Sequence, residues 1–348
     1  MRNGKKNKKW VKPVMIALIV LLSLVLLVLI LGGIMLHKFH SMWGSVETLP
    51  TNQSILSSKE IATIEQETDP VESGYTGVIL APEEVTWATE PAPTIGHEPE
   101  IINILLIGQD RRPGQGRQRS DAMILCTINL DAKTLTMTSF LRDLYVQIPM
   151  PDGNYDTRLN HAYQYGGAQL LNDTLALNFG VHVDGNVAVD FDSFIELVDI
   201  MGGVSINLTQ AEANLLIKYG HSVRAGVNNL NGKEALAYSR IRIIGTDFAR
   251  TNRQRTVLNS MLQSCKNADI TTLTNLMNEV LKIVATDMTS DEILDYMMKI
   301  LPILRDLEVK TQTIPTRETY TSARIRGMSV LVPDLEAVRQ ILQESLVG

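Results

Sequence analysis

Arginine recurs at the ends of strand-like segments in this sequence. Arg142 follows such a segment, and Arg240 and Arg242 stand two residues apart, so an extended backbone would point both to one face. Guanidinium groups bind phosphate oxygens in bidentate fashion and stay charged when partly desolvated. A single arginine is more typical of a solvated surface, but their number favours an anion site. The remaining arginines in this pattern are Arg111, Arg112, Arg117, Arg119, Arg158, Arg250 and Arg253.

Carboxylates are interleaved with these arginines. Asp110, Asp121, Asp143 and Asp247 all lie within a few residues of one of them. Such residues can simply pair with the guanidinium groups. They can also hold Mg²⁺ against a phosphate, because that ion usually takes one or two carboxylates plus phosphate oxygens. The spacing leaves both interpretations open.

Several common catalytic motifs are missing from the sequence. It contains no GxSxG, HExxH, paired CxxC or Walker-type Gly-Lys-Ser/Thr motif. The glycine-rich loop from Gly108 to Gly116 follows an apolar run, but it lacks the Lys-Ser/Thr and the helix start of a nucleotide-binding loop. The pattern therefore favours phosphate chemistry carried by arginines.

Strands and helices alternate around these residues. Ile101–Gly108 is a continuous apolar run, typical of a central strand buried on both faces. Asp121–Leu130 and Thr134–Phe140 flank a short turn and predict a hairpin. Leucines at helical spacing predict a helix over 167–179 that stops at Gly180.

The second half of the chain continues the alternation. Asp192 and Thr209 are predicted to cap helices over 192–200 and 210–218. The pattern predicts an α/β fold, with a mixed central β-sheet covered by helices on both faces. The other predicted elements are strands at 187–191 and 204–208, a helix over 250–265, two more helices to about 305, a strand pair at 309–314 and 328–332, and a final helix from Asp334.

The N-terminal part predicts a membrane anchor. Val14–Leu36 is a 23-residue run without charge, and a helix of that length rises about 35 Å, enough to cross a bilayer core. It is longer than the apolar region of a signal peptide and lacks a small-residue cleavage site. Basic residues precede it, so we expect 1–13 as a cytoplasmic tail, 14–36 as a single transmembrane helix, and the rest outside the cell membrane.

The segment that follows is acidic and rich in proline. Residues 40–100 hold 11 Asp or Glu and one basic residue, Lys59, in a chain of net charge −6. Low hydrophobicity and repeated Pro predict a flexible stalk over 37–100, before a catalytic domain over 101–348. The two cysteines, Cys126 and Cys265, leave a disulfide open, and the predicted fold does not depend on one.

Six ordered motifs resemble the LytR-CpsA-Psr family, whose layout is a short cytoplasmic tail, one span and an outside domain. Two departures stand out: Leu141 where the family often has Pro, and Arg158 where Lys is common. The second keeps the charge but changes the hydrogen-bonding fork. The motifs are Asn103–Asp110, Arg119–Asp121, Leu141–Asp143, Arg158–Tyr163, Tyr238–Arg242 and Arg250–Arg255.

The resemblance implies a phosphotransferase of cell wall biogenesis. Such enzymes move an anionic glycopolymer, of the wall teichoic acid or capsular polysaccharide class, from an undecaprenyl-pyrophosphate carrier onto peptidoglycan. It implies that Asp110 and Asp121 hold Mg²⁺, and that Arg142, Arg240, Arg242 and Asp121 are catalytic. The implied pyrophosphate-binding residues are Arg119, Arg142, Arg158, Arg240, Arg242, Arg250 and Gln254.

Other interpretations stay open. Some family members hydrolyse the pyrophosphate, and a non-catalytic envelope regulator that only binds polyprenyl phosphates would need the same arginines. Asp110 or Asp121 is a candidate base for the acceptor hydroxyl. The prenyl tail needs an apolar groove, for which the helices at 168–179 and 192–200 are candidate walls, although core packing explains them equally well. A nucleic-acid partner is not expected, because the short basic tail holds no element that reads DNA.

Overall fold

The computed structural model describes residues 46–50, 54–57, 60–61, 77–88, 90–111 and 116–347. They belong to one compact unit, Val46–Gly348. The predicted tail and the predicted span at 14–36 lie outside the described residues. Among the residues that are described, no helix is both long and apolar enough to cross a bilayer.

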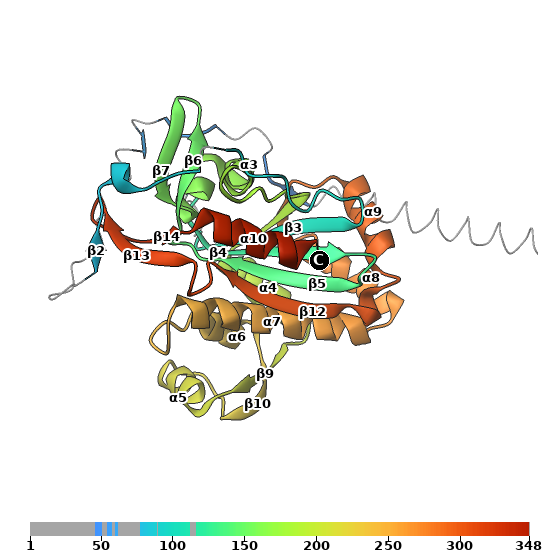
Figure 1. Cartoon of the computed structure of the whole chain (residues 1–348). Coiled ribbons are helices and arrows are strands. Elements are labelled where there is room, and N and C mark those ends of the chain that lie inside the picture. Colours follow the sequence, from blue (N-terminus) through green and yellow to red (C-terminus); the bar gives the residue numbers. More distant parts are fainter. Residues whose placement is uncertain are drawn as a thin grey trace, which may run out of the picture. The chain divides into compact units, whose positions relative to one another are not determined.

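A seven-stranded mixed sheet forms the centre of this unit (Figure 1). Its order is β1-β11-β8-β3-β4-β5-β12, so the apolar run predicted as a central strand lies between β8 and β4. β3 runs antiparallel to β4 and parallel to β8, and β12 is parallel to β5. The strands are β1 (Glu47–Thr48), β3 (Ile101–Gln109), β4 (Ser120–Asn129), β5 (Thr134–Phe140), β8 (Gly185–Val189), β11 (Ala285–Thr286) and β12 (Glu308–Ile314).

Helices and three smaller sheets surround the central sheet. The helices are α3 (Asn160–Phe179), α4 (Phe191–Ile200), α5 (Gln210–Lys218), α6 (Gly232–Ser239), α7 (Asp247–Asn267), α8 (Ile270–Val280), α9 (Ser290–Ile300) and α10 (Leu335–Leu346), with short 3-10 turns η1 (Pro82–Glu84) and η2 (Leu304–Asp306). The small sheets pair β6 (Tyr145–Met150) with β7 (Gly153–Arg158), β9 (Val204–Leu208) with β10 (Gly226–Leu230), and β14 (Met328–Pro333) with β13 (Tyr320–Ile325) and β2 (Val78–Ile79).

Helices pack against both faces of the central sheet. Because side chains alternate along a strand, Leu105 and Ile107 of β3 enter one core, with residues of α3 and α10. Ile102 of β3 enters another core, against which Leu258 of α7 and Ile300 of α9 pack. This two-sided burial explains why β3 is apolar at nearly every position.

Turn and capping residues correctly predicted the boundaries of several helices and strands. The hairpin of β4 and β5 forms as predicted, and its turn comprises the three predicted residues and Leu130. Thr209 caps α5 in a capping box with Glu212, and Asp334 caps α10. Gly180 ends α3 in the left-handed conformation, with φ of 73°. These predictions are confirmed because each depends on residues close together in the chain.

Two predicted details are wrong. Asp190, not Asp192, caps α4, because β8 ends at Val189 and leaves Asp190 extended. The predicted pair of strands at 309–314 and 328–332 does not form, since β12 joins β5. β14 instead pairs with β13 across a two-residue turn in which Arg326 and Gly327 have positive φ, a hairpin signal of the kind that favours glycine.

The predicted stalk is partly folded in the residues that the structure describes. Glu47–Thr48 adds a strand to the central sheet, and Val78–Ile79 adds one to β13. Ile61, Val85 and Ile95 are buried. These apolar side chains are scattered singly among acidic residues and prolines, so no periodic pattern marks them in the sequence.

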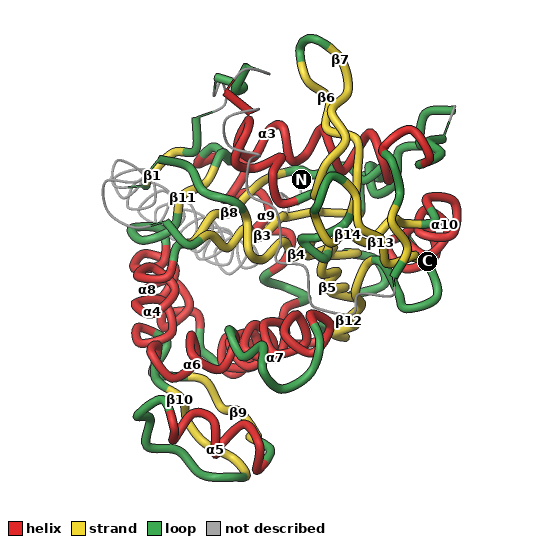
Figure 2. The backbone as a smooth tube through the Cα atoms, turned by 90° about the vertical axis from the view of Figure 1, so that its left-hand side faces the viewer, coloured by secondary structure: helices red, strands yellow, loops and turns green. Residues whose placement is uncertain are grey.

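A small lobe extends from the rest of the unit. It contains β9, β10 and α5, and lies beyond α6 and α7 in both views (Figures 1 and 2). Its core includes Val204, Ile206 and Leu216, and continues into α6 and α7 through Tyr238 and Val257. α6 also packs closely on α4, because a side chain at Gly232 would collide with the backbone of Ile195. The lobe is thereby fixed to the helices that flank the candidate site.

Candidate functional site

A cavity of about 1300 Å³ opens between the central sheet and helices α4, α6 and α7. The ends of β3 and β5 and the start of β4 contribute its polar side. The structure brings all the site residues implied by the family resemblance to its wall. These residues are Asp110, Arg119, Asp121, Arg142, Arg158, Arg240, Arg242, Arg250 and Gln254.

Arg142 and Asp121 form the closest ion pair of this wall. Arg142 Nη1 donates to Asp121 Oδ1 at 2.7 Å, while its Nε lies 3.5 Å from Asp143 Oδ2 and 3.9 Å from Asp247 Oδ2. Burial lowers the pKa of Arg142, but these three carboxylates outweigh burial and the net direction is upward. Arg142 therefore stays a cation beside an incoming phosphate.

Arg240 and Arg242 lie on the loop between α6 and α7, in a different backbone conformation from the predicted one. Arg240 is the helical C-cap of α6, so the two arginines do not share an extended strand. α6 continues to Ser239 because Asn231 and Glu234 cap its start reciprocally. The Arg240 guanidinium lies 4.2 Å from the ring centre of Phe191, and Arg242 Nη2 lies 3.7 Å from Asp121 Oδ1. Both still line the cavity.

Arg253 holds this loop in place. Its Nη1 donates to the Ile241 carbonyl at 3.1 Å and its Nη2 to the Ile244 carbonyl at 2.9 Å. Its Nε donates to Glu212 Oε1 at 2.7 Å, and both side chains are nearly buried. Arg253 thus positions the segment that carries Arg242, although Arg253 itself does not line the cavity.

Arg250 is buried and only partly satisfied. Its side chain is 3% exposed and its Nη2 donates to Asp247 Oδ2 at 3.2 Å. Its Nε and Nη1, and Oε1 of Gln254 one turn on, are buried without a hydrogen-bond partner among the described residues. Burial lowers the pKa of Arg250. An unsatisfied buried cation is costly, so this position favours a bound anion.

The guanidinium group of Arg158 donates hydrogen bonds to the protein backbone. Both Nε and Nη2 donate to the Ser329 carbonyl, at 3.1 and 2.9 Å. Its Nε also lies 3.7 Å from Asp143 Oδ1. Burial raises the pKa of Asp143, against the opposing influence of Arg142 and Arg158. Arg158 therefore links β14 to the cavity wall as well as adding charge.

Three cavity residues were not assigned a role from the sequence. His161 is buried, with Nε2 3.5 Å from Arg119 Nη1 and Nδ1 3.0 Å from Thr157 Oγ1. Asn160 Oδ1 and Gln164 Oε1 are buried without a hydrogen-bond partner in the described part of the chain. Asn160 and His161 lie in the resembling motif that begins at Arg158, which was the available signal.

Other predicted anion ligands lie elsewhere. Arg117 Nε donates to the Gln164 carbonyl at 2.9 Å and Arg111 lies 3.7 Å from Glu47. Both line a separate pocket of about 300 Å³. Arg112 is outside the described residues. Cys126 and Cys265 are free thiols, and burial raises the pKa of both.

The other end of the cavity is apolar. It is lined by Phe194 and Leu197 of α4, by Val257 and Met261 of α7, and by Val284. The helix predicted at 192–200 thus lines the cavity, as expected if it forms a wall of an apolar groove. The helix at 168–179 does not: its leucines fill the core between α3 and the sheet instead.

Two cavity carboxylates are suited to a divalent ion. Asp110 and Asp121 line the same wall as the arginines, and both ion pairs of Asp121 use Oδ1. Among the described residues, no group of three or more His, Cys, Asp or Glu forms a ready-made metal site. Mg²⁺ does not need one, because substrate phosphates and water complete its shell. The residues present therefore fit this ion.

A cavity with arginines at one end and apolar side chains at the other is complementary to an anionic amphiphile. Comparison with known proteins identifies the class. The LytR_cpsA_psr family model matches residues 52–345, and the chain belongs to this family.

Relatives and solved structures agree with this assignment. The chain is 37% identical over 203 residues to the polyisoprenyl-teichoic acid–peptidoglycan teichoic acid transferase TagU of Bacillus licheniformis, covering 57% of this chain and 63% of that protein. It is 33% identical over 247 residues to TagU of Bacillus subtilis, covering 70% and 76%. A structure of TagT of B. subtilis bound to LIIa-WTA is 26% identical with a TM-score of 0.59, covering 76% of this chain and 100% of that one.

Proposed function

We propose that this protein transfers an anionic glycopolymer from a polyprenyl-pyrophosphate carrier to a hydroxyl group of peptidoglycan. The observation that carries the proposal is the two-ended cavity. Arg142 and Arg250 lie at the polar end, and Phe194 and Val257 at the apolar end. A lipid-linked pyrophosphate has the same two parts, a doubly charged head and a hydrocarbon tail.

The arrangement is suited to phosphoryl transfer. The acceptor hydroxyl oxygen bonds to the phosphorus on the sugar side, and the bond from that phosphorus to the bridging oxygen breaks. Polyprenyl phosphate leaves with the added charge, and Arg142, Arg240 and Arg242 neutralise it. Asp110 or Asp121 takes the proton of the acceptor hydroxyl. Catalysis of this kind rests on positioning and on charge stabilisation.

A divalent ion is part of the proposal. Asp110 and Asp121 would hold Mg²⁺, which supplies additional charge neutralisation at the phosphate oxygens when it is bound. Asp121 also fixes Arg142 at 2.7 Å and lies 3.7 Å from Arg242. Asp121 therefore aligns two of the cations that contact the leaving group.

The relatives support the transfer chemistry and the acceptor. Proteins named as teichoic acid transferases to peptidoglycan are 33–37% identical to this chain. The match covers just under two thirds of the B. licheniformis protein. We extend the same activity to this chain because its predicted site residues gather at one cavity.

A membrane location completes the proposal. The uncharged run Val14–Leu36, preceded by six basic residues, would anchor the chain with its N-terminus in the cytoplasm and residues 37–348 outside. A carrier lipid in the same bilayer is then within reach of the cavity.

The test is turnover of a lipid-linked pyrophosphate glycan by the full-length protein, with peptidoglycan fragments as acceptor. Arg240→Ala is compared with wild type and with Arg305→Ala, an exposed arginine of η2 that does not line the cavity. We expect Arg240→Ala to lower turnover about a hundredfold, the loss typical of removing one charge-stabilising donor. The control variant retains full turnover.

Three other outcomes decide against the transferase. Equal turnover of Arg240→Ala and wild type excludes the arginine mechanism. Binding of the lipid without turnover, even with Mg²⁺ and acceptor present, identifies a regulator that only binds the carrier. Release of free glycan phosphate with no product on the acceptor identifies a pyrophosphatase.

A further inference from the structure

The rim of the cavity differs sharply from its interior. Most of the lining residues are buried or half-buried, and only five are exposed. They are three cations and two large apolar residues, and none is acidic. The five rim residues are Tyr219, Lys233, Arg240, Arg242 and Ile243.

The rim comes from one stretch of the chain with an unusual charge. From Ala213 to Thr246 there are five Lys or Arg and one acidic residue, Glu234, in a chain whose net charge is −6. The carboxylate of Glu234 accepts a hydrogen bond from the Asn231 backbone N–H as part of the α6 cap. Two further exposed cations belong to this stretch, Lys218 and Arg224, and neither lines the cavity.

Apolar exposure is concentrated in the same stretch. Ile243 is 78% exposed and Tyr219 is 52% exposed, and Ile217 of α5 is exposed nearby in sequence. Ile243 is the most exposed large apolar side chain among the described residues. An isoleucine with so much of its surface in water at a cavity mouth contributes little burial to the core of the unit. Such exposure marks a contact surface.

We propose that this rim docks on the surface of an anionic phospholipid bilayer. Cations on the rim attract acidic headgroups and strengthen binding about fivefold per Lys or Arg near the surface. Tyr219 and Ile243 enter the headgroup region, where aromatic and apolar side chains are favoured. The long stems of Lys233 and Arg242 can lie along the apolar boundary while their charges stay in water.

Docking would give the cavity a function at the bilayer. The mouth of the cavity, at the rim, would lie against lipid, so a polyprenyl-linked substrate enters the cavity there without crossing water. This part rests on the proposed function. The docking itself does not, because it depends only on the exposed residues and their charges.

The test measures how deeply the rim lies in the bilayer. Full-length protein is reconstituted in vesicles of phosphatidylcholine and phosphatidylglycerol with brominated acyl chains. An environment-sensitive fluorophore is attached to Ile243→Cys. Labelling favours this exposed site because burial raises the pKa of Cys126, to about 12, and that of Cys265. Met298→Cys is the matched control, since Met298 is an apolar side chain, 63% exposed, that does not line the cavity.

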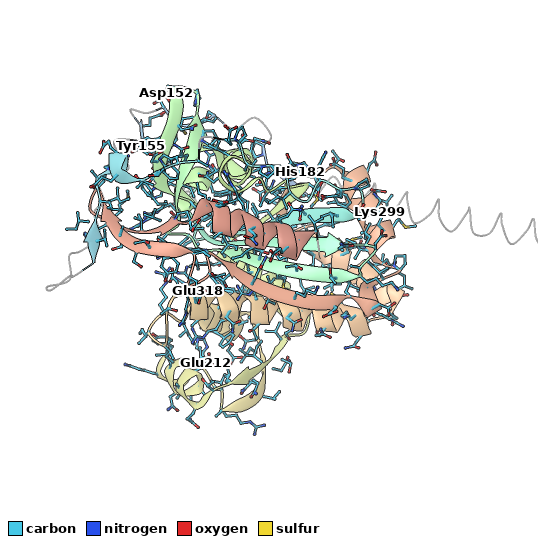
Figure 3. The ribbon with its side chains drawn as sticks, viewed as in Figure 1. Asp152, Tyr155, His182, Glu212, Lys299 and Glu318 are labelled. Atoms are coloured by element: carbon cyan, nitrogen blue, oxygen red, sulfur yellow. The ribbon has the colours of Figure 1, made fainter. Side chains whose placement is uncertain are left out.

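The control lies well away from the rim. Lys299, the neighbour of Met298, lies at the α9 end of the unit, whereas Glu212 lies in the lobe with α5 (Figure 3). We expect bromine quenching and a blue-shifted emission for the probe at 243 and neither change for the probe at 298. An unquenched probe at 243 overturns the docking proposal, and so does equal quenching at both positions.

Charge reversal separates lipid docking from contact with another protein. Lys218→Glu combined with Arg224→Glu, neither of which lines the cavity, should weaken docking about fivefold or more per charge. Arg305→Glu combined with Lys310→Glu is the control pair, since both residues are exposed, lie outside the basic stretch 213–246 and do not line the cavity. Equal quenching in vesicles of phosphatidylcholine alone, or no effect of the reversal, overturns the anionic-lipid assignment.

Turnover distinguishes this proposal from the transferase itself. In anionic vesicles the Lys218→Glu and Arg224→Glu variant should turn over lipid-linked substrate several-fold more slowly than wild type. In detergent with a short-chain substrate the two should be equal. Turnover by a protein whose probe is never quenched rejects docking and keeps the transferase. A quenched probe in a protein that never turns over substrate keeps docking and rejects the transferase.

Discussion

Two arginines three residues apart on α7 are used in opposite ways. Arg253 is nearly buried, and all three of its nitrogens donate to partners within the protein, namely Glu212 and two carbonyls. Arg250 is also buried, but two of its nitrogens find no partner among the described residues. Both belong to one helix and one chemical type. Only the neighbouring residues differ. Because of them, Arg253 stabilises the fold, whereas Arg250 is available to bind a ligand.

The contrast has an energetic reason. A buried charge is tolerated when its partners replace water, and it destabilises the fold when they do not. Arg253 meets this condition in the free protein. Arg250 would meet it only when an anion occupies the cavity, so part of the binding free energy comes from relieving its unsatisfied state.

The largest expected effect is on folding, from breaking the Arg253 pair. Arg253→Met leaves Glu212 buried without its cation and frees the loop that carries Arg242, so we expect a loss of about 3–5 kcal/mol in the free energy of unfolding. Chemical denaturation measures it, with Arg305→Met as an exposed control. An unchanged denaturation midpoint would show that the loop is held by other contacts.

The next effect is on turnover. Arg250→Met removes a cation that the free fold satisfies only through Asp247, so we expect turnover to fall about 100- to 1000-fold with a much smaller loss of stability than Arg253→Met. Turnover and thermal unfolding of the same preparation check both halves. A stability loss comparable to that of Arg253→Met would mean that the two arginines have the same role.

Ligand binding should separate the two positions directly. Inorganic pyrophosphate at about a hundred times its dissociation constant would stabilise wild type by about 2.7 kcal/mol. We expect a much smaller gain for Arg250→Met, because the site has lost a buried cation. Thermal unfolding with and without pyrophosphate measures this difference. An equal gain in both proteins would place the anion elsewhere.

A smaller effect is expected on the pH dependence of stability, through the carboxyl group of Glu212. Burial opposes ionisation of Glu212, but the Arg253 hydrogen bond and the Thr209 contacts outweigh it and hold the pKa below its ordinary 4.5. A carboxyl with a lowered pKa stabilises the fold above its ordinary pKa, and this contribution is lost as the pH falls through the lowered value. The stability difference between wild type and Glu212→Gln should therefore shrink in acid. A difference that stays constant with pH would contradict it.

The smallest effect is expected at Arg158, which combines the two roles. Its Nε and Nη2 both donate to the Ser329 carbonyl, so Arg158→Lys loses the fork and keeps the charge. We expect a loss of about 1 kcal/mol in stability and turnover within a few-fold of wild type. Parallel unfolding and turnover assays check this. A large loss of turnover would show that the fork also reaches the substrate.

Much of the fold follows from short stretches of sequence. Alternating apolar residues and a three-residue turn predict the β4–β5 hairpin, and Thr209 and Asp334 mark helix starts because a capping side chain bonds within its own first turn. The pairing of β12 with β5 does not follow in this way. Their paired residues are far apart in the chain, and several strands offer a similar edge.

The candidate site divides in the same manner. The resembling motifs implied arginines and carboxylates for a pyrophosphate, and the structure places those residues on one cavity wall. Arg111, Arg117 and Arg253 of the wider arginine pattern do not line this cavity. The backbone of Arg240 was predicted incorrectly, because α6 extends to Ser239 and makes Arg240 its cap. The apolar end of the cavity could not be predicted, because no sequence signal distinguishes its residues from those of a packed core.

The sequence by itself determined the charged residues, most local elements and the family. Only the tertiary structure decided which arginines bind within the protein and which face the cavity. The physical reason is that a guanidinium group's role depends on the acceptors around it. Arg253 finds its carboxylate 41 residues away on α5, while Arg250, one turn earlier on α7, borders the cavity.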